Sequence, residues 1–174
     1  MQNKIYTLGE RAMIQSFKPV INDKSTILIL GTAPGAKSLE CNQYYANSRN
    51  QFWKILYALF EEEYQEDYEK RLTFLSKHHI ALWDVIKHCN RKSSLDVDIK
   101  DEEIHDFKWL FNSYPNIRIV IFNGAKAYKV FKKKVGFNFK GVEFHQLCST
   151  SPAHAVTIEK KLKEWSIIKA TGKE

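Results

Sequence analysis

The densest group of residues that could bind a flat heterocycle lies between Cys41 and Trp53. It contains tyrosines, amides and an arginine in close order: Gln43, Tyr44, Tyr45, Asn47, Arg49 and Asn50. Aromatic rings offer a stacking face and amides offer paired donors and acceptors, which suits a flat heterocycle. Alternatively, the aromatic residues belong to the core and Asn50 caps a helix. We favour the core for Phe52 and Trp53, while both interpretations stay open for Tyr45 and Asn50.

A glycine-containing loop, Gly31-Thr32-Ala33-Pro34-Gly35, directly follows an apolar run. Its backbone N–H groups could hold an anion or the carbonyl of a base, since glycine permits close approach of a ligand to the backbone. The loop lacks the Lys-Ser/Thr pair of a phosphate-binding P-loop and the spacing of a dinucleotide fingerprint. A tight structural turn is therefore the competing interpretation.

Two further polar segments follow apolar runs. Asn123-Gly124 can cap a helix, or the Asn123 amide can present a donor and an acceptor to a base edge. The segment Ser149 to His154 carries hydroxyls and precedes a predicted helix. Hydroxyls and N–H groups at such a position bind phosphates well, so Ser149, Thr150, Ser151 and His154 are candidate phosphate contacts. The alternative is ordinary helix capping with His154 as a surface residue.

Several classes of protein are disfavoured by composition. The six histidines show no metal-ligand spacing, and the three cysteines are widely spaced and odd in number, so we expect neither a metal site nor a disulfide framework. No apolar run has the roughly 20 residues of a membrane span, and the first twenty residues do not resemble a signal peptide. We expect a soluble, reduced, cytoplasmic protein.

The elements that must position these segments alternate between strands and helices. Short apolar runs predict four strands, at 27–30, 80–85, 117–122 and 142–147. Helical periodicity predicts helices at 52–60, 66–77, 101–112 with Asp101 as N-cap, 127–135 and 158–168. This alternation predicts one three-layer α/β domain over residues 1–174 with a parallel sheet. Ligands bind beyond the carboxyl ends of such strands, so the loops beginning at Gly31, Asp84, Asn123 and Ser149 are the candidate site.

The net charge of +7 is unevenly distributed. Residues 1–122 hold 16 basic and 16 acidic side chains, whereas residues 123–174 hold 11 lysines and 4 glutamates, so the last 52 residues carry the whole excess. A local excess of this kind favours a polyanionic partner, and Lys132, Lys133 and Lys134 are its densest run. A merely solvated surface is the alternative.

Five motifs in succession carry a family resemblance: LGTAPG, SLECNQYYANSRNQFW, WDVIKHCNRKSSLD, IVIFNGAKAY and CSTSPAHA. They resemble the uracil-DNA glycosylase superfamily, and within it the hypoxanthine-DNA (deoxyinosine) glycosylase branch. The resemblance covers a core of about residues 17–170. It implies an α/β/α sandwich around a four-stranded parallel sheet, no cofactor, and a monomeric, monofunctional enzyme. The implied reaction removes a deaminated base from DNA and leaves an abasic site.

The resemblance also implies roles for individual residues. Superfamily relatives carry a water-activating Asp, Asn or Glu in the first glycine loop, but here Thr32 and Ala33 stand there and neither does this well. The hypoxanthine branch uses an asparagine in its RNxFW segment, which corresponds to Asn50. Tyr45 would stack on the base, whose edge would meet Asn123 and the backbone of Gly31, Thr32 and Ala33. Lys132 to Lys134 and the loop of Ser149, Thr150, Ser151 and His154 would hold the DNA.

This chain departs from the motifs of the branch at two places, and these departures bear on which base is removed more than on the class of reaction. The branch commonly has YYAHPRN where this chain has YYANSRN at residues 44–50, and Cys148 stands where relatives often have proline. Many relatives also carry a histidine after the last strand, which cannot be matched to His154. The alternatives are a uracil- or thymine-mismatch glycosylase, and a non-catalytic phosphate- or nucleic-acid-binding α/β module.

Overall fold

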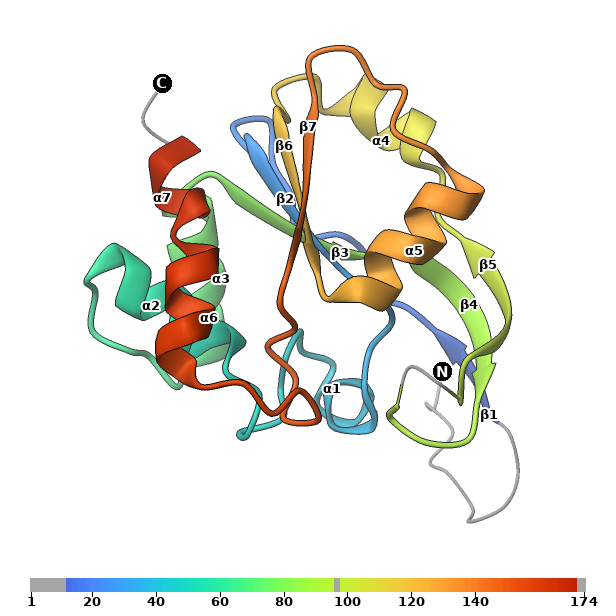
Figure 1. The fold of residues 1–174 in the computed structure, drawn as a ribbon, viewed down its shortest axis with the longest axis horizontal. Coiled ribbons are helices and arrows are strands. Elements are labelled where there is room, and N and C mark those ends of the chain that lie inside the picture. The colour runs from blue at the N-terminus through green and yellow to red at the C-terminus, as the bar shows by residue number, and fades with distance from the viewer. Residues whose placement is uncertain (1–11, 96–97, 172–174) are drawn as a thin grey trace.

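The computed structural model describes residues 12–95 and 98–171, and its centre is a four-stranded parallel sheet (Figure 1). The strands are β2 (Ile27–Gly31), β3 (Ile80–Asp84), β6 (Ile119–Asn123) and β7 (Glu143–Leu147), in the order β3-β2-β6-β7. Every residue of β2, β3 and β6 is buried, as their apolar runs predict, whereas β7 lies at the edge and is partly exposed. The predicted parallel sheet is confirmed.

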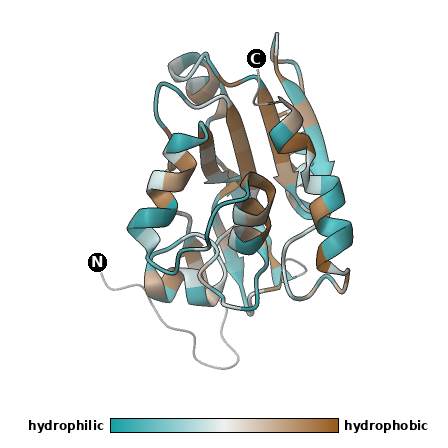
Figure 2. Cartoon of the chain, turned by 90° about the vertical axis from the view of Figure 1, so that its left-hand side faces the viewer, coloured by the Kyte–Doolittle hydropathy of each residue, from teal (hydrophilic) through white to brown (hydrophobic). Residues whose placement is uncertain are grey.

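Helices cover both faces of this sheet. The face that includes Ile27 and Ile29 packs against α2 (Phe52–Phe60), α3 (Tyr68–Lys77), α6 (Ile158–Trp165) and α7 (Ile167–Thr171). The face that includes Leu28 and Leu30 packs against α4 (Phe107–Ser113) and α5 (Ala125–Lys134). The apolar strands lie between helices whose outer surfaces are largely hydrophilic (Figure 2). This is the predicted three-layer α/β/α arrangement.

A second, antiparallel sheet was not expected. It consists of β1 (Ala12–Gln15), β4 (Ile86–Arg91) and β5 (Lys100–Ile104), in the order β1-β4-β5. The predicted helix over 101–112, with Asp101 as N-cap, is wrong in its first part. Residues 100–104 instead pair with β4, and the helix begins at Phe107, where the Asp106 carboxylate accepts a 2.9 Å hydrogen bond from the Trp109 N–H. Strand pairing outweighs local propensity here.

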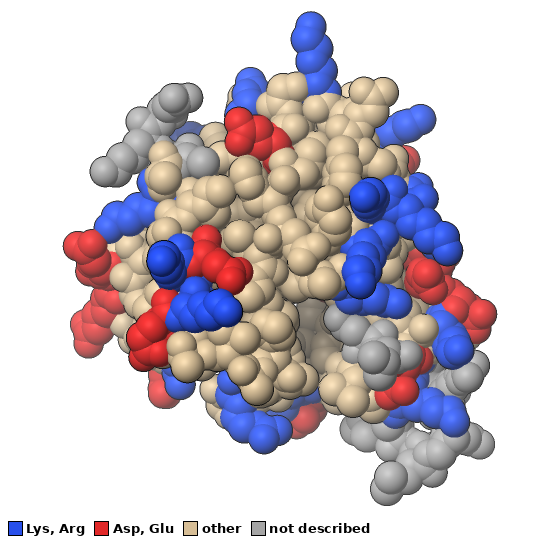
Figure 3. Space-filling model, in the orientation of Figure 1, with Lys and Arg blue, Asp and Glu red and all other residues tan. Residues whose placement is uncertain are grey.

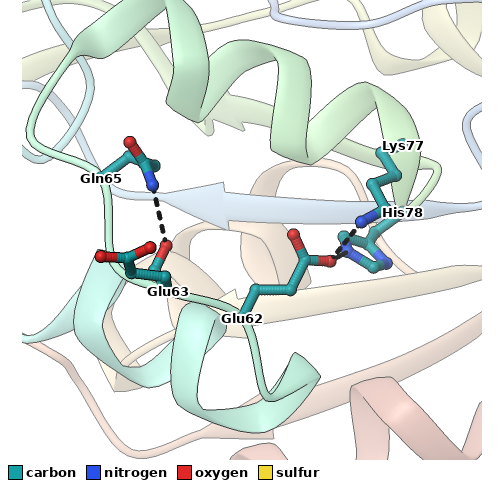
Figure 4. A network of polar contacts seen from close by, with 5 residues as sticks. All are labelled: Glu62, Glu63, Gln65, Lys77 and His78. Carbon is teal, nitrogen blue, oxygen red and sulfur yellow. Dashed lines mark hydrogen bonds and ion pairs between the residues drawn. The ribbon is translucent and has the colours of Figure 1, made fainter.

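The acidic segment after α2 is tied to the end of α3 (Figure 4). Glu62 accepts a 2.7 Å hydrogen bond from the Lys77 ammonium and lies 2.6 Å from the ring of His78. The Lys77 ammonium lowers the pKa of Glu62. These contacts fix the α2–α3 connection.

The short helix α1 (Ala36–Cys41) follows β2 at the carboxyl edge of the parallel sheet. The connection that leaves β2 continues through α2 and α3 on one face, whereas the connection that leaves β6 continues through α5 on the other. Strands β2 and β6 are parallel neighbours, and their connections lead to strands on opposite sides of them, so the strand order reverses between β2 and β6. Open α/β sheets bind ligands in the crevice at such a point.

Candidate functional site

A pocket of about 660 Å³ lies at this crevice. A hollow is visible there in the lower half of Figure 3. The four loops predicted from the sequence all contribute to its lining, which includes Gly31 to Ser38, Tyr44, Tyr45, Asn50, Asp84, Asn123 and Ser149 to His154. Every predicted catalytic and base-binding residue therefore lines one cavity. The loop predicted from Asp84 to Asp96 is wrong over most of its length, because residues 86–91 form strand β4; Asp84, Ser94 and Leu95 of this segment line the pocket, and Asp96 lies outside the described residues.

The first loop approaches its neighbours closely at Gly31. A Cβ atom at this position would lie 2.5 Å from Oδ1 of Asp84 and 3.2 Å from the hydroxyl of Tyr45. The backbone carbonyls of Gly31 and Thr32 accept hydrogen bonds from Val85 (2.9 Å) and Ile86 (3.1 Å). The loop is thus fixed against the segment that follows β3, and a side chain at position 31 would displace the Asp84 carboxylate.

Asp84 is the acidic side chain of the pocket that the sequence analysis did not assign. It is 4% exposed and ends β3, beside Gly31 on β2. Among the described residues that line the pocket it is the only carboxylate. The pKa of the neighbouring Tyr44 is raised well above its usual value, mainly by burial and then by the charge of Asp84. A lone acid that ends a buried strand was the signal available in the sequence.

Asn123 and Thr150 form a buried pair from two different loops, with 9% and 0% of their surfaces exposed. The Asn123 amide donates to the Thr150 hydroxyl (2.8 Å), and its oxygen accepts from the Thr150 N–H (2.9 Å). Because a backbone N–H only donates, the amide cannot be reversed. Each amide atom keeps capacity for one more hydrogen bond, and Asn123 lines the pocket. Gly124, not Asn123, is the N-cap of α5.

Tyr45 lies between the core and the pocket. Its ring stacks on that of Phe52, with centroids 3.8 Å apart and planes 19° from parallel. Its backbone has a positive φ of 54°, a conformation uncommon for tyrosine. Phe52 and Trp53 are fully buried, as favoured from the sequence. Tyr45 is therefore the half-buried end of an aromatic stack that reaches into the pocket.

Asn50 is half-buried in the lining of the pocket, just before α2. Its side-chain oxygen accepts a 3.0 Å hydrogen bond from the Phe52 N–H, so it does help to begin this helix. The next residue, Gln51, donates its N–H to the Thr150 carbonyl at 3.1 Å. Asn50 is thereby held near the Asn123–Thr150 pair. Its second oxygen lone pair and its NH₂ group remain for another partner.

The loop Ser149–His154 is held by contacts that the sequence did not reveal. Within it, the Ser149 hydroxyl accepts from the Ser151 N–H at 3.2 Å. Lys161 on α6 is only 1% exposed and donates to the His154 carbonyl at 3.2 Å, and burial lowers the pKa of its ammonium. Burial also raises the pKa of the Cys148 thiol to about 11. Lys161 thus ties the end of the loop to α6, while the His154 side chain is exposed.

Lys132, Lys133 and Lys134 do not line the pocket. They form the last turn of α5, a ten-residue helix that begins beside the pocket and spans about 15 Å. Lys134 lies 3.7 Å from the carboxylate of Glu102 on β5. Figure 3 shows lysine and arginine side chains gathered over α5, on the right of the molecule. The structure therefore separates this basic run from the pocket.

The described residues contain no cluster of three or more His, Cys, Asp or Glu side chains that could hold a metal ion. Within the same residues, no helix is both long and apolar enough to cross a membrane.

Comparisons with known proteins identify the family. The model of the Uracil DNA glycosylase superfamily matches residues 18–172. A protein named hypoxanthine DNA glycosylase from Methanosarcina barkeri is 37% identical to this chain, and the match covers 87% of this chain and 95% of that protein. A protein of the same name from Methanosarcina acetivorans is 36% identical, and the match covers 88% of this chain and 96% of that protein. A solution NMR structure from Methanosarcina acetivorans, described as a candidate uracil DNA glycosylase, superposes with a TM-score of 0.75 at 32% identity, covering 91% of this chain and 99% of that one. The resemblance seen in the motifs is confirmed, and the chain belongs to the uracil DNA glycosylase superfamily.

Proposed function

We propose that this protein is a monofunctional DNA glycosylase that hydrolyses the N-glycosidic bond of a deaminated base, principally hypoxanthine, and leaves an abasic site. The observation that carries the proposal is the pocket at the β2/β6 crevice, which all the predicted catalytic and base-binding residues line. The names of the two Methanosarcina relatives support hypoxanthine as the base. The protein would act as a monomer in the cytoplasm, without a cofactor.

The pocket would bind an extruded base by stacking and by its Watson–Crick edge. Tyr45 offers the stacking face, and Gly31, Thr32 and Ala33 lie along the same lining, where their backbone N–H groups would meet the base. Deamination of adenine replaces the N1 lone pair by an N–H and the amino group by a carbonyl. The Asp84 carboxylate accepts from such an N–H, and the fixed Asn123 amide donates to such a carbonyl. Adenine presents the opposite pattern.

Bond cleavage would depend on positioning and on stabilisation of the leaving base. As the C1′–N9 bond breaks, its electron pair goes to the base and the sugar becomes oxocarbenium-like. Asn50 would orient the water that attacks C1′. Because an amide is a poor base, the rate would come mainly from orientation and from hydrogen bonds to the departing base.

DNA would be held beside the pocket by Ser149, Ser151 and His154, with Lys132, Lys133 and Lys134 adding longer-range attraction. Thr150, predicted as a DNA contact, is instead fully buried and paired with Asn123 through both its hydroxyl and its N–H. Three residues of this loop are exposed to the solvent that a DNA strand would displace, Pro152, Ala153 and His154. Phosphate contacts of this kind position a strand without reading its sequence.

The proposal is tested by incubating the protein with labelled duplexes that contain hypoxanthine, uracil, xanthine or a G·T mismatch, followed by alkaline cleavage of abasic sites. Hypoxanthine release at the highest rate is expected. Preferential release of uracil or of mismatched thymine would reassign the substrate. No product from any duplex would support a non-catalytic nucleic-acid-binding module instead.

A further inference from the structure

Arg91, the last residue of β4, is a charged side chain that is completely buried, with 0% of its surface exposed. Its guanidinium donates a hydrogen bond to the backbone carbonyl of Pro34 in the first loop. Among the described residues, no group accepts from its Nε–H and no carboxylate forms an ion pair with it. Burial of a charge without an opposite charge costs free energy. An arginine held at this cost points to a use for its charge.

The peptide group that joins Pro34 to Gly35 connects Arg91 with the pocket. Pro34 and Gly35 both line the pocket, whereas Arg91 does not. The described peptide bonds are all trans, and the C=O and N–H of a trans peptide point in opposite directions. Because the Pro34 carbonyl points at Arg91, the Gly35 N–H points away from it. Among the described residues no group accepts from this N–H, so it is available to a ligand of the pocket.

The departing base needs a positive charge more than the bound base does. When the glycosidic bond breaks, its electron pair goes to the base, which leaves as an anion and then takes a proton from water. The Asp84 carboxylate in the lining repels this anion. Lys37 and Arg49, which also line the pocket, are exposed, and water and salt screen their charges. The buried charge of Arg91 is screened far less.

We propose that Arg91 is a positioning residue that acts through the Pro34–Gly35 peptide to stabilise the negative charge on the departing base. The guanidinium fixes the direction of this peptide and polarises it, because a cation bonded to a carbonyl strengthens the N–H of the same peptide group as a donor. The Gly35 N–H then donates to the base as the charge develops. This inference rests on the proposed function, because it needs a base that leaves as an anion.

The test compares the full-length protein with Arg91→Met, which removes the charge and the donor but keeps a long side chain. The single-turnover rate of hypoxanthine excision at saturating protein is expected to fall about 10-fold or more. Affinity for the DNA stays within about twofold, because the bound base is still neutral. The denaturation midpoint is not lowered, because an apolar side chain replaces a buried unpaired charge. A merely structural role would lower the rate, the affinity and the stability together.

Two further variants separate the charge from the hydrogen bond. Arg91→Lys retains a positive charge and a donor and keeps most of the excision rate. Arg91→Gln retains a donor without the charge, and its rate falls as in Arg91→Met. The matched control is Arg71→Met on α3, since Arg71 is also buried and donates to a backbone carbonyl, that of Gln65, at 2.8 Å, but does not line the pocket. This control leaves the rate unchanged.

The outcomes distinguish the role of Arg91 from the proposed function. A full excision rate in Arg91→Met or Arg91→Gln would overturn the role of the charge and leave the glycosylase assignment intact. A loss in Arg91→Lys as large as in Arg91→Gln would do the same. Absence of hypoxanthine release by the unmodified protein would instead overturn the proposed function, and the role of Arg91 with it.

Discussion

The two sheets of this molecule place their polar residues differently. In the parallel sheet, β2, β3 and β6 are buried throughout, and polar side chains occur only where strands end, at Asp84 and Asn123. In the antiparallel sheet, polar side chains occur along the whole length of β4 and β5, and most are at least partly exposed. Burial on both faces thus concentrates polar chemistry at one edge of the parallel sheet, where the pocket lies.

The antiparallel sheet supports this edge from the side. The buried Arg91, at the end of β4, donates to the Pro34 carbonyl in the first loop. The connection from β4 to β5 then carries Ser94 and Leu95 to the pocket. The parallel sheet therefore supplies the polar groups of the pocket, and the antiparallel sheet supports the loops that surround them.

The sharpest test of this functional difference between the two sheets is to replace one aspartate by asparagine in each sheet. Asp84→Asn is expected to lower hypoxanthine excision about 100-fold or more on single- and double-stranded DNA, because an amide N–H would face the N1–H of the base. Asp101→Asn on exposed β5 is the matched control and should leave the rate unchanged. Single-turnover rates at saturating protein provide the measurement. Similar rates for both variants would erase the functional difference between the sheets.

A smaller effect is expected from the basic run on α5, which ends beside β5 rather than at the pocket. Replacement of Lys132, Lys133 and Lys134 by alanine should weaken DNA binding and reduce the slope of log affinity against log salt, since fewer counterions are released. The single-turnover rate at saturation should stay the same. Titrations at several salt concentrations measure this, and an unchanged slope would show that these lysines do not contact DNA.

The smallest expected effect is a pH dependence of the free energy of unfolding, and it comes from a residue next to the antiparallel sheet. His105, which follows β5, stacks on Trp83 with centroids 3.9 Å apart. Burial, followed by the nearby charges of Lys87 and His88, lowers the pKa of His105 from 6.5 to about 4. The unfolded chain therefore binds more protons between these values, and stability falls as the pH drops from about 6.5 to 4. We expect a loss of about 1–2 kcal/mol, less than the full shift implies because the ring is partly accessible.

Chemical denaturation across this pH range measures that loss. His105→Phe keeps the stacked ring without a titrating group and should flatten the dependence. If the variant and the unmodified protein lost stability in parallel, another group would be responsible.

The sequence predicted the parallel sheet because complete burial demands uninterrupted apolar runs, as in Ile27–Gly31. The residues KDEEI of β5 carry no such pattern, since their strand conformation comes from pairing with β4. The loops beginning at Gly31, Asp84, Asn123 and Ser149 were predicted because each follows a predicted strand of the parallel sheet. The Asn123–Thr150 pair and the support of His154 by Lys161 were not, because each joins polar residues from separate segments whose contact depends on the completed fold.

The central claim is that the pocket cleaves an N-glycosidic bond with a water oriented by Asn50. The most direct measurement is single-turnover excision of hypoxanthine by Asn50→Ala, together with its DNA affinity. We predict a rate about 100-fold lower or more, because orientation of the attacking water is lost, with affinity within about twofold of the unmodified protein. An unchanged excision rate in Asn50→Ala would contradict the account.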